Sequence, residues 1–261
     1  MRKSLLPLAA ALALSACAGQ RAAPVAPATA PLTRQSPAIL AALSDTRRPP
    51  ADTARDDARH AAETLAFAGA RPGARVGELL PAGGYFTRLL AIAVGEQGRV
   101  YAVVRPDATV AAWEKSALAV AAQYPNVTVV RTEFTALSFP EPLDVVFTAQ
   151  NYHDFHITYY GFGDVDQINR AAFAALKPGG VYVIIDHSAV AGTPPSADRN
   201  SLHRIDQADV RREVAAAGFV LDAESDALRN GGDPRTAGVF DPAIRGHTDQ
   251  FMLRFRKPAA H

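Results

Sequence analysis

The 261-residue sequence has a single cysteine and almost no net charge, and both absences narrow what the protein can be. With Cys17 alone, no disulfide can form within the chain, so the fold has to be stabilised by its core. The 27 Lys and Arg are balanced by 26 Asp and Glu, which gives no electrostatic basis for nucleic acid as a partner. The apolar fraction of 48% is ordinary for a globular protein and allows a sizeable core.

Long apolar runs are also missing. The run from Leu5 to Leu14 follows two basic residues and has the length of a signal-peptide core, but it is too short to span a bilayer. It leads into Ser15-Ala16-Cys17, which with Leu14 resembles the bacterial lipobox and so implies cleavage before Cys17 and lipid attachment to that cysteine. An ordinary signal peptide with an incidental cysteine is the alternative.

We therefore expect residues 1–16 to be a lipoprotein signal peptide. The exported chain would be anchored through Cys17 on the periplasmic side of a bacterial membrane. Because the next residue is not the aspartate associated with retention in the inner membrane, the outer membrane is the expected site.

Beyond this leader, the composition predicts a tether and one folded domain. Residues 17–50 are rich in Ala and Pro, which predicts a tether with little packed structure and a short helical turn near Ile39 to Leu43. In residues 51–261, strand-like and helix-like stretches alternate. This predicts an α/β fold, a doubly wound Rossmann-like sheet of seven mostly parallel strands with helices on both faces and an antiparallel pair at the end. The strands are expected at 75–80, 99–104, 127–131, 143–148, 181–185, 219–223 and 250–254, and the helices at 52–68, 85–94, 108–123, 165–176 and 206–217, with a turn at 177–180.

The turn after the first expected strand has the features of a ligand-binding loop. An acidic residue ends the strand, and small residues then lead into a helix. Glycines let backbone N–H groups approach a ligand, and the helix N-terminus adds positive partial charge. A tight turn without a ligand would have the same composition. The residues that would contact a ligand here are Glu78, Pro81, Ala82, Gly83, Gly84 and Tyr85.

Histidine–aspartate pairs follow two of the expected strands, at 153–154 and at 186–187. In doubly wound sheets, ligands bind beyond the carboxyl ends of the strands, so these side chains are expected to converge on one cleft. They would act as general acid and base or as metal ligands, with a carboxylate orienting the neighbouring imidazole. Solvated loop residues are the alternative. The candidate catalytic residues are Tyr152, His153, Asp154, Asp186 and His187.

Charged residues on the expected first helix share one face, because Asp52, Arg55, Asp56 and Arg59 follow helical spacing. We favour a solvated face with local ion pairs. The alternative is a lid over the cleft, whose arginines would meet an anionic substrate. His203, just before the helix at 206–217, is a further candidate for the cleft.

With these segments in place, the chain resembles class I S-adenosylmethionine (SAM) methyltransferases, in particular a bacterial group of predicted methyltransferases that often carry export signals. Two departures stand out. The family has glycine at alternate positions after the first acid, where this chain has Leu80, Ala82 and Gly84, and Val104 replaces the acid that receives the ribose hydroxyls. The resemblance covers most of the chain after the tether and is carried by residues 78–85, 98–105, 133–134, 151–154, 175–180, 186–187, 228–230 and 239–246.

The resemblance implies a SAM-dependent methyltransferase with SAM as cofactor and a small-molecule acceptor. It places the methionine part of SAM at the turn over residues 78–85, and the adenine at Glu133 and Phe134. His153 or Asp154 would remove a proton from a neutral acceptor. No metal is expected. The implied cofactor-binding residues are Glu78, Pro81, Ala82, Gly83, Gly84, Tyr85, Arg105, Glu133, Phe134 and Asn151.

Two other functions stay open. SAM is made in the cytoplasm, whereas the leader would export this chain, and Val104 stands where the family has the acid that binds the ribose. The first alternative is therefore a binding module in the cell envelope that uses the fold without SAM. A metal-dependent hydrolase would instead use His153, Asp154, Asp186 and His187. Dinucleotide oxidoreduction is disfavoured, because the Gly-x-Gly-x-x-Gly fingerprint is absent. Nothing in the sequence indicates the oligomeric state.

Overall fold

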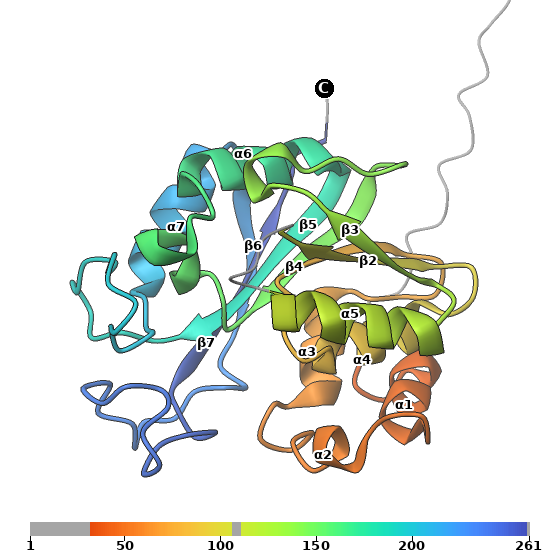
Figure 1. The fold of residues 1–261 in the computed structure, drawn as a ribbon, viewed down its shortest axis with the longest axis horizontal. Coiled ribbons are helices and arrows are strands. Elements are labelled where there is room, and N and C mark those ends of the chain that lie inside the picture. Colours follow the sequence, from red (N-terminus) through yellow and green to blue (C-terminus); the bar gives the residue numbers. More distant parts are fainter. Residues whose placement is uncertain (1–31, 106–110, 260–261) are drawn as a thin grey trace, which may run out of the picture. The chain divides into compact units, whose positions relative to one another are not determined.

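Seven strands form one sheet in the order β3-β2-β1-β4-β5-β7-β6. The first five strands are parallel, and β7 lies antiparallel between β5 and β6, which confirms the doubly wound α/β prediction. The computed structural model describes residues 32–105 and 111–259 (Figure 1). The strands are β1 (Arg75–Leu79), β2 (Arg99–Val104), β3 (Val127–Arg131), β4 (Leu143–Ala149), β5 (Leu176–His187), β6 (Val220–Ser225) and β7 (Gln250–Arg256).

Helices cover both faces of this sheet (Figure 1). Successive side chains of a strand point to opposite faces, so Val145 packs in one core and Val146 in the other. The helices α1, α3, α4 and α5 contribute to the first core, and α6 and α7 contribute to the second. The α-helices are α1 (Pro37–Ser44), α2 (Pro50–Thr53), α3 (Ala61–Ala68), α4 (Tyr85–Val94), α5 (Ala111–Gln123), α6 (Val165–Ala175) and α7 (Gln207–Ala216).

Packed structure begins earlier in the chain than the expected boundary at residue 50. Within the expected tether, α1 buries Ile39 and Ala42 completely in the core that also holds α4. These two residues lie three apart and so share one helix face. The sequence indicated a short helical turn here, but not that it packs in the core. The expected signal peptide, Cys17 and the first part of the expected tether lie outside the described residues. Among those described, no helix is both long enough and apolar enough to cross a membrane.

The helix expected over residues 52–68 is interrupted. Turns over residues 54–60 separate α2 from α3, and the backbone of His60 is left-handed (φ 43°). The aspartates of this stretch form ion pairs with distant arginines rather than only along a helix face: Asp52 with Arg88 at 2.8 Å and Asp56 with Arg48 at 2.5 Å. The Asp52–Arg88 bond holds the segment against α4. Asp52 also forms the expected local ion pair with the exposed Arg55, at 2.7 Å, so the favoured solvated face with local ion pairs is confirmed only in part.

The turn expected at residues 177–180 lies inside β5. Leu143 of β4 pairs with Leu176, but two residues later Val145 pairs with Val181, so the register shifts across this stretch. Gly179 adopts φ 79°, a left-handed value that favours glycine. The Pro-Gly-Gly sequence therefore forms an irregularity within one long strand.

Replacing Ile39 by Ala should destabilise the domain by about 2–4 kcal/mol, because a fully buried isoleucine leaves a cavity when it is truncated. The neighbouring Leu40 is 46% exposed, and its replacement by Ala should cost less than about 0.5 kcal/mol. Urea unfolding followed by circular dichroism measures both. Equal effects for the two variants would mean that α1 is not part of the core.

Candidate active site

The turn between β1 and α4 keeps a glycine-like backbone without most of the glycines. Leu80, Ala82 and Gly84 have φ values of 56°, 47° and 79°, so all three are left-handed. For the two side-chain-bearing residues this costs on the order of 1–2 kcal/mol each. Hydrogen bonds hold Leu80 in place, since its N–H donates to the Val103 carbonyl (3.2 Å) and its carbonyl accepts from Asn151 Nδ2 (3.1 Å). The turn thus adopts conformations that favour glycine at two positions where the sequence has no glycine.

The two glycines of the turn have different roles. A Cβ atom on Gly84 would lie 2.6 Å from Cγ2 of Val120 on α5, so this glycine is needed for helix packing. Gly84 is also absent from the cavity wall, contrary to its expected ligand-binding role. Gly83 lines the cavity, and a Cβ there would meet no described atom within 4 Å. Because Gly83 is exposed at the edge of the cavity, a side chain at position 83 can be accommodated there without disturbing the fold.

Most of the expected cofactor residues line one cavity of about 320 Å³. This volume falls in the range of about 300–1,000 Å³ that is typical of ligand pockets. Its wall combines the β1–α4 turn, the residues after β4 and the loop that carries His203. From the expected sets, it includes Glu78, Pro81, Ala82, Gly83, Tyr85, Asn151, His153, Asp154 and His187.

Glu78 is a buried carboxylate on this wall. Its side chain is 4% exposed, and its Oε2 atom makes no hydrogen bond within the described part of the chain. Burial raises the pKa of Glu78 to about 7, and the Thr87 hydroxyl and the Arg88 guanidinium offset this only in part. The cationic and hydrogen-bonding compensation around Glu78 is therefore smaller than a buried carboxylate needs, and Oε2 receives none of the hydrogen bonds.

The residues expected to hold the adenine do not line the cavity. Phe134 is completely buried and packs against Phe155 and Phe162, with ring centroids 5.7 Å and 5.2 Å away. Glu133 accepts an ion pair from Arg105 at 3.0 Å. Arg105 also donates to the carbonyl oxygen of Tyr160, at 2.7 Å. The interpretation of Phe134, Glu133 and Arg105 as cofactor contacts is therefore not supported by their positions. Asp107, next to the missing ribose acid, lies outside the described residues.

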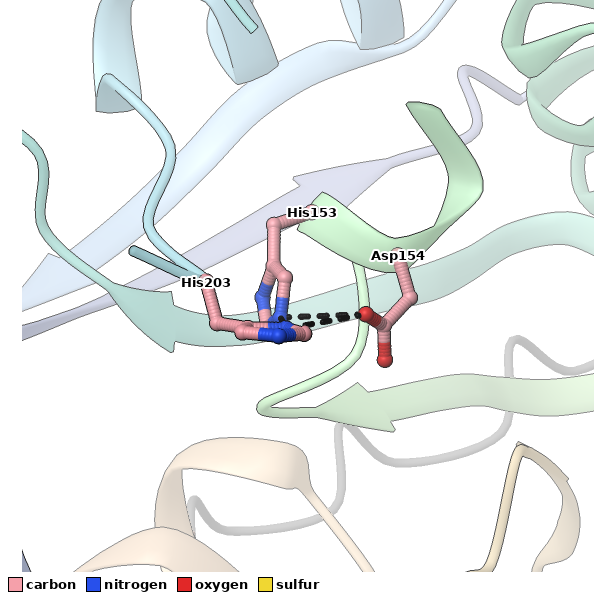
Figure 2. Close-up of side chains that lie close together, drawn as sticks. All are labelled: His153, Asp154 and His203. Atoms are coloured by element: carbon pink, nitrogen blue, oxygen red, sulfur yellow. Dashed lines mark hydrogen bonds and ion pairs between the residues drawn. The ribbon is translucent and has the colours of Figure 1, made fainter. Parts of the chain in front are cut away.

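The two histidine–aspartate pairs do come together. The His153 backbone N–H donates to Asp186 Oδ2 at 2.8 Å, and His153 Nδ1 lies 2.8 Å from Asp186 Oδ1. On its other side, His153 Nε2 lies 3.2 Å from Asp154 Oδ1 and 3.2 Å from Nδ1 of His203. Figure 2 shows the side chains of His153, Asp154 and His203 pointing toward one another. His203 belongs to a distant loop, and its backbone is left-handed (φ 54°).

The two neighbouring histidines have opposite electrostatic environments. Burial alone would lower the pKa of His153, but the carboxylates of Asp186 and Asp154 outweigh it and raise this pKa to about 10. Burial lowers the pKa of His187 to about 3, although its ring centroid is only 6.1 Å from that of His153. His187 Nδ1 lies 2.7 Å from the Thr248 hydroxyl. Neither imidazole is tuned to the neutral pKa that suits a general base.

Two of the expected catalytic residues face away from the cavity. The Tyr152 hydroxyl is completely buried, donating to Glu213 Oε2 (3.0 Å) and accepting from Asn169 Nδ2 (2.8 Å). Asp186 is also completely buried and does not line the cavity. Tyr152 therefore belongs to the core, and Asp186 positions His153 rather than contacting a substrate.

Arg59 was not among the expected site residues, yet it lines the cavity beside Arg55. Burial, together with the positive charge of Arg55, lowers the pKa of Arg59 to about 10. Its Nη2 atom donates to Gln150 Oε1 at 2.8 Å, and no carboxylate pairs with it among the described residues. The helical spacing of charged residues at 52–59 had indicated this arginine wall of the cavity. It did so only through the alternative that we did not favour, in which the segment forms a lid over the cleft.

A second cavity of about 350 Å³ shares this arginine wall. Arg55, Arg59, Gln150 and His187 line both cavities, and Thr248 and Gln250 close the second one. The site therefore has two adjoining compartments, one at the β1–α4 turn and one beside β7.

No family model matches the chain, and no curated protein matches it. Solved structures share its fold. They include a SAM dependent methyltransferase from Aquifex aeolicus, with a TM-score of 0.53 and 19% identity, covering 78% of this chain and 93% of that one. N-methyltransferase NodS from Bradyrhizobium japonicum WM9 has a TM-score of 0.52 and 13% identity, covering 79% and 98%.

The [4+2]-cyclase SpnF has a TM-score of 0.56 and 19% identity, covering 80% of this chain and 82% of that one. These similarities confirm the Rossmann-like methyltransferase fold. At such identities they show the fold alone, and the cyclase illustrates that one fold can bear different activities.

Replacing Glu78 by Gln should change stability in a pH-dependent way. Below an ordinary glutamate pKa of 4.5, the carboxyl is protonated in folded and unfolded chains alike, so the variant should match the wild type. As the pH rises to about 7, the unfolded chain releases its proton first and the wild type loses stability. Near pH 8 the variant should be more stable by about 2 kcal/mol in urea unfolding.

Replacing the exposed Glu96 by Gln provides the control and should have little effect at either pH. A Glu78→Gln variant that is less stable than the wild type near pH 8 would contradict the prediction, because it would mean that the folded chain stabilises the ionised carboxylate.

Proposed function

We propose that the protein is a SAM-dependent methyltransferase whose acceptor is a small molecule with an anionic nucleophile. The observation that carries the proposal is the β1–α4 turn, where a strained, glycine-like backbone and the incompletely compensated carboxylate of Glu78 line the same cavity. Strained backbone at non-glycine residues is concentrated at functional sites.

The described residues fit the methionine end of SAM. That end carries an ammonium group, and the buried carboxylate of Glu78 is only partly compensated by the groups around it. Gly83 leaves room beside it, and the ten-residue helix α4 begins at the turn with its positive partial charge. The ribose and adenine end does not find its expected partners, because Val104 is apolar and buried and Phe134 lies in the core.

Methyl transfer requires a nucleophile aligned with the electrophilic methyl group that bound SAM supplies. The electrostatics of the site disfavour a general base. His153 is held protonated, His187 is a very weak base, and His153 and His203 keep the pKa of Asp154 below its ordinary value against the effect of burial. We therefore propose that the acceptor is already anionic, so that the expected deprotonation step is not needed. The site would only have to align the acceptor with the methyl group.

The second cavity suits such an acceptor. Arg55 and Arg59 bring two positive charges to its wall, and Arg59 is bonded to an amide oxygen instead of a carboxylate. A buried guanidinium without a counter-ion favours an anionic ligand. In this arrangement the arginines bind and orient the acceptor, and the Glu78 turn binds the cofactor.

S-adenosylhomocysteine should bind the full chain with a dissociation constant on the order of micromolar, measured by calorimetry. Replacing Gly83 by Leu should weaken binding roughly tenfold or more, because the new side chain fills the cavity, while the unfolding midpoint stays unchanged. Gly231 is exposed and equally unobstructed, so Gly231→Leu is the matched control and should bind as the wild type does.

The absence of binding at millimolar ligand would refute a SAM-dependent activity. Binding that Gly83→Leu leaves unchanged would instead place the cofactor outside this cavity. The affinity should also rise between about pH 6 and pH 8, as Glu78 ionises.

We also propose export and lipid attachment at Cys17, on the lipobox-like sequence alone. A fatty-acid analogue fed to expressing bacteria should label the wild-type chain and fail to label a Cys17→Ser variant. Equal labelling of the two would exclude Cys17 as the acylated residue.

A further inference from the structure

Three potential ligand atoms from two distant segments meet on the wall of the cavity at the β1–α4 turn. We propose that His153 Nε2, Asp154 Oδ1 and His203 Nδ1 bind a divalent transition-metal ion such as Zn²⁺. His153 and Asp154 lie in the short 3-10 helix His153–His156 after β4, and His203 comes from the loop before α7 (Figure 2). The proposal does not depend on methyl transfer, and it uses a different ligand set from the one suggested by the sequence.

The distances among these atoms match the edges of a metal coordination polyhedron. The two contacts of His153 Nε2 are 3.2 Å each, and His203 Nδ1 lies 3.5 Å from Asp154 Oδ1. In a tetrahedral zinc site with bonds of about 2.0–2.1 Å, ligand atoms are about 3.3–3.4 Å apart. An ion can therefore sit within bonding distance of all three atoms with little rearrangement.

Hydrogen bonds alone leave one of these atoms unsatisfied. Asp154 Oδ1 is buried and lies 3.2 Å from His153 Nε2 and 3.5 Å from His203 Nδ1, but it forms no hydrogen bond of good geometry within the described part of the chain. A buried carboxylate oxygen without a well-formed hydrogen bond is costly. A metal ion would satisfy Asp154 Oδ1 and both ring nitrogens at once.

The surroundings of His153 are those of a metal-binding histidine. Such a histidine almost always has its second ring nitrogen bonded to a carboxylate or carbonyl, which fixes its orientation. Here His153 Nδ1 contacts Asp186 Oδ1 at 2.8 Å, which leaves Nε2 directed at the cluster. Asp186 is in turn fixed by the backbone N–H groups of His153 and His187.

The charge and openness of the cluster also suit a metal ion. Two carboxylates, Asp154 and Asp186, flank His153, so the cluster attracts a cation. All three proposed ligands line the cavity, and three protein ligands with a fourth position open to a pocket are typical of catalytic rather than structural zinc sites. His203 reaches the cluster only in a left-handed conformation, with its ring 5.1 Å from that of Phe240. Such strain is characteristic of functional positions.

The test is Zn²⁺ binding to the full chain after treatment with a chelator, measured by calorimetry and by elemental analysis after desalting. We expect one ion per chain and a higher unfolding midpoint with Zn²⁺. His203→Ala and, separately, the isosteric Asp154→Asn should each weaken Zn²⁺ binding by more than roughly 100-fold. Loss of a residue that only hydrogen-bonds a metal ligand costs up to about 100-fold, so a larger loss identifies a direct ligand. His247 is exposed and outside the cluster, so His247→Ala is the matched control and should bind as the wild type does.

Two results would overturn the proposal. One is a wild-type chain that retains no stoichiometric Zn²⁺ and gives no visible d–d absorption with Co²⁺. The other is binding that His203→Ala and Asp154→Asn both leave unchanged, which would place the ion elsewhere. These measurements contain no SAM or S-adenosylhomocysteine, so their outcome is independent of the cofactor proposal.

Discussion

Asp186 is the second-last residue of strand β5, and its carboxylate is completely buried. Three groups contact this carboxylate at hydrogen-bond distance. They are the backbone N–H groups of His153 and His187 and the His153 ring. Leaving a buried charge unpaired costs several kcal/mol, so this carboxylate fixes where the chain must go after β4. It pins the 3-10 helix of His153 against the end of β5, and the placement of the cluster and of the cavity wall follows from that attachment.

The β1–α4 turn adopts left-handed backbone at positions that carry side chains. Glycine is the usual residue in left-handed positions because it has no Cβ, yet Leu80 and Ala82 adopt them here. Bonds from Asn151 and to Val103 stabilise the conformation of Leu80. A structure that sustains this strain on both sides of Pro81 is more than a loose connection between a strand and a helix, and this separates the turn from an ordinary tight βα turn.

The sequence predicted the structure correctly where one local pattern determines it. It was much less informative where contacts between residues far apart in the chain decide the conformation. Apolar runs such as 181–185 predict central strands, and Asp206 caps α7 as expected, accepting from the Ala208 N–H at 2.9 Å. A short helical turn was expected near α1, but its Ala- and Pro-rich context gave no sign that it packs in the core. Phe134 was assigned to the cofactor because a position in a motif does not show which way a side chain turns. His203 and Arg59 were named only as further candidates, because the same local patterns fit solvated residues and the contacts that bring them to the site are long-range.

The site divides into regions of opposite charge, and this division constrains its ligands more than the fold does. Glu78 lies at the turn and the Asp154–Asp186 pair lies beside His153, whereas Arg55 and Arg59 form the wall shared with the second cavity. A ligand must therefore bring a cationic group to the carboxylates and an anionic group to the arginines. At a ring separation of 6.1 Å, the carboxylates of Asp186 and Asp154 raise the pKa of His153 against the effect of burial, whereas burial lowers the pKa of His187. A cation beside His153 would replace a proton on its ring, so the chemistry of the cleft depends on which cation occupies it.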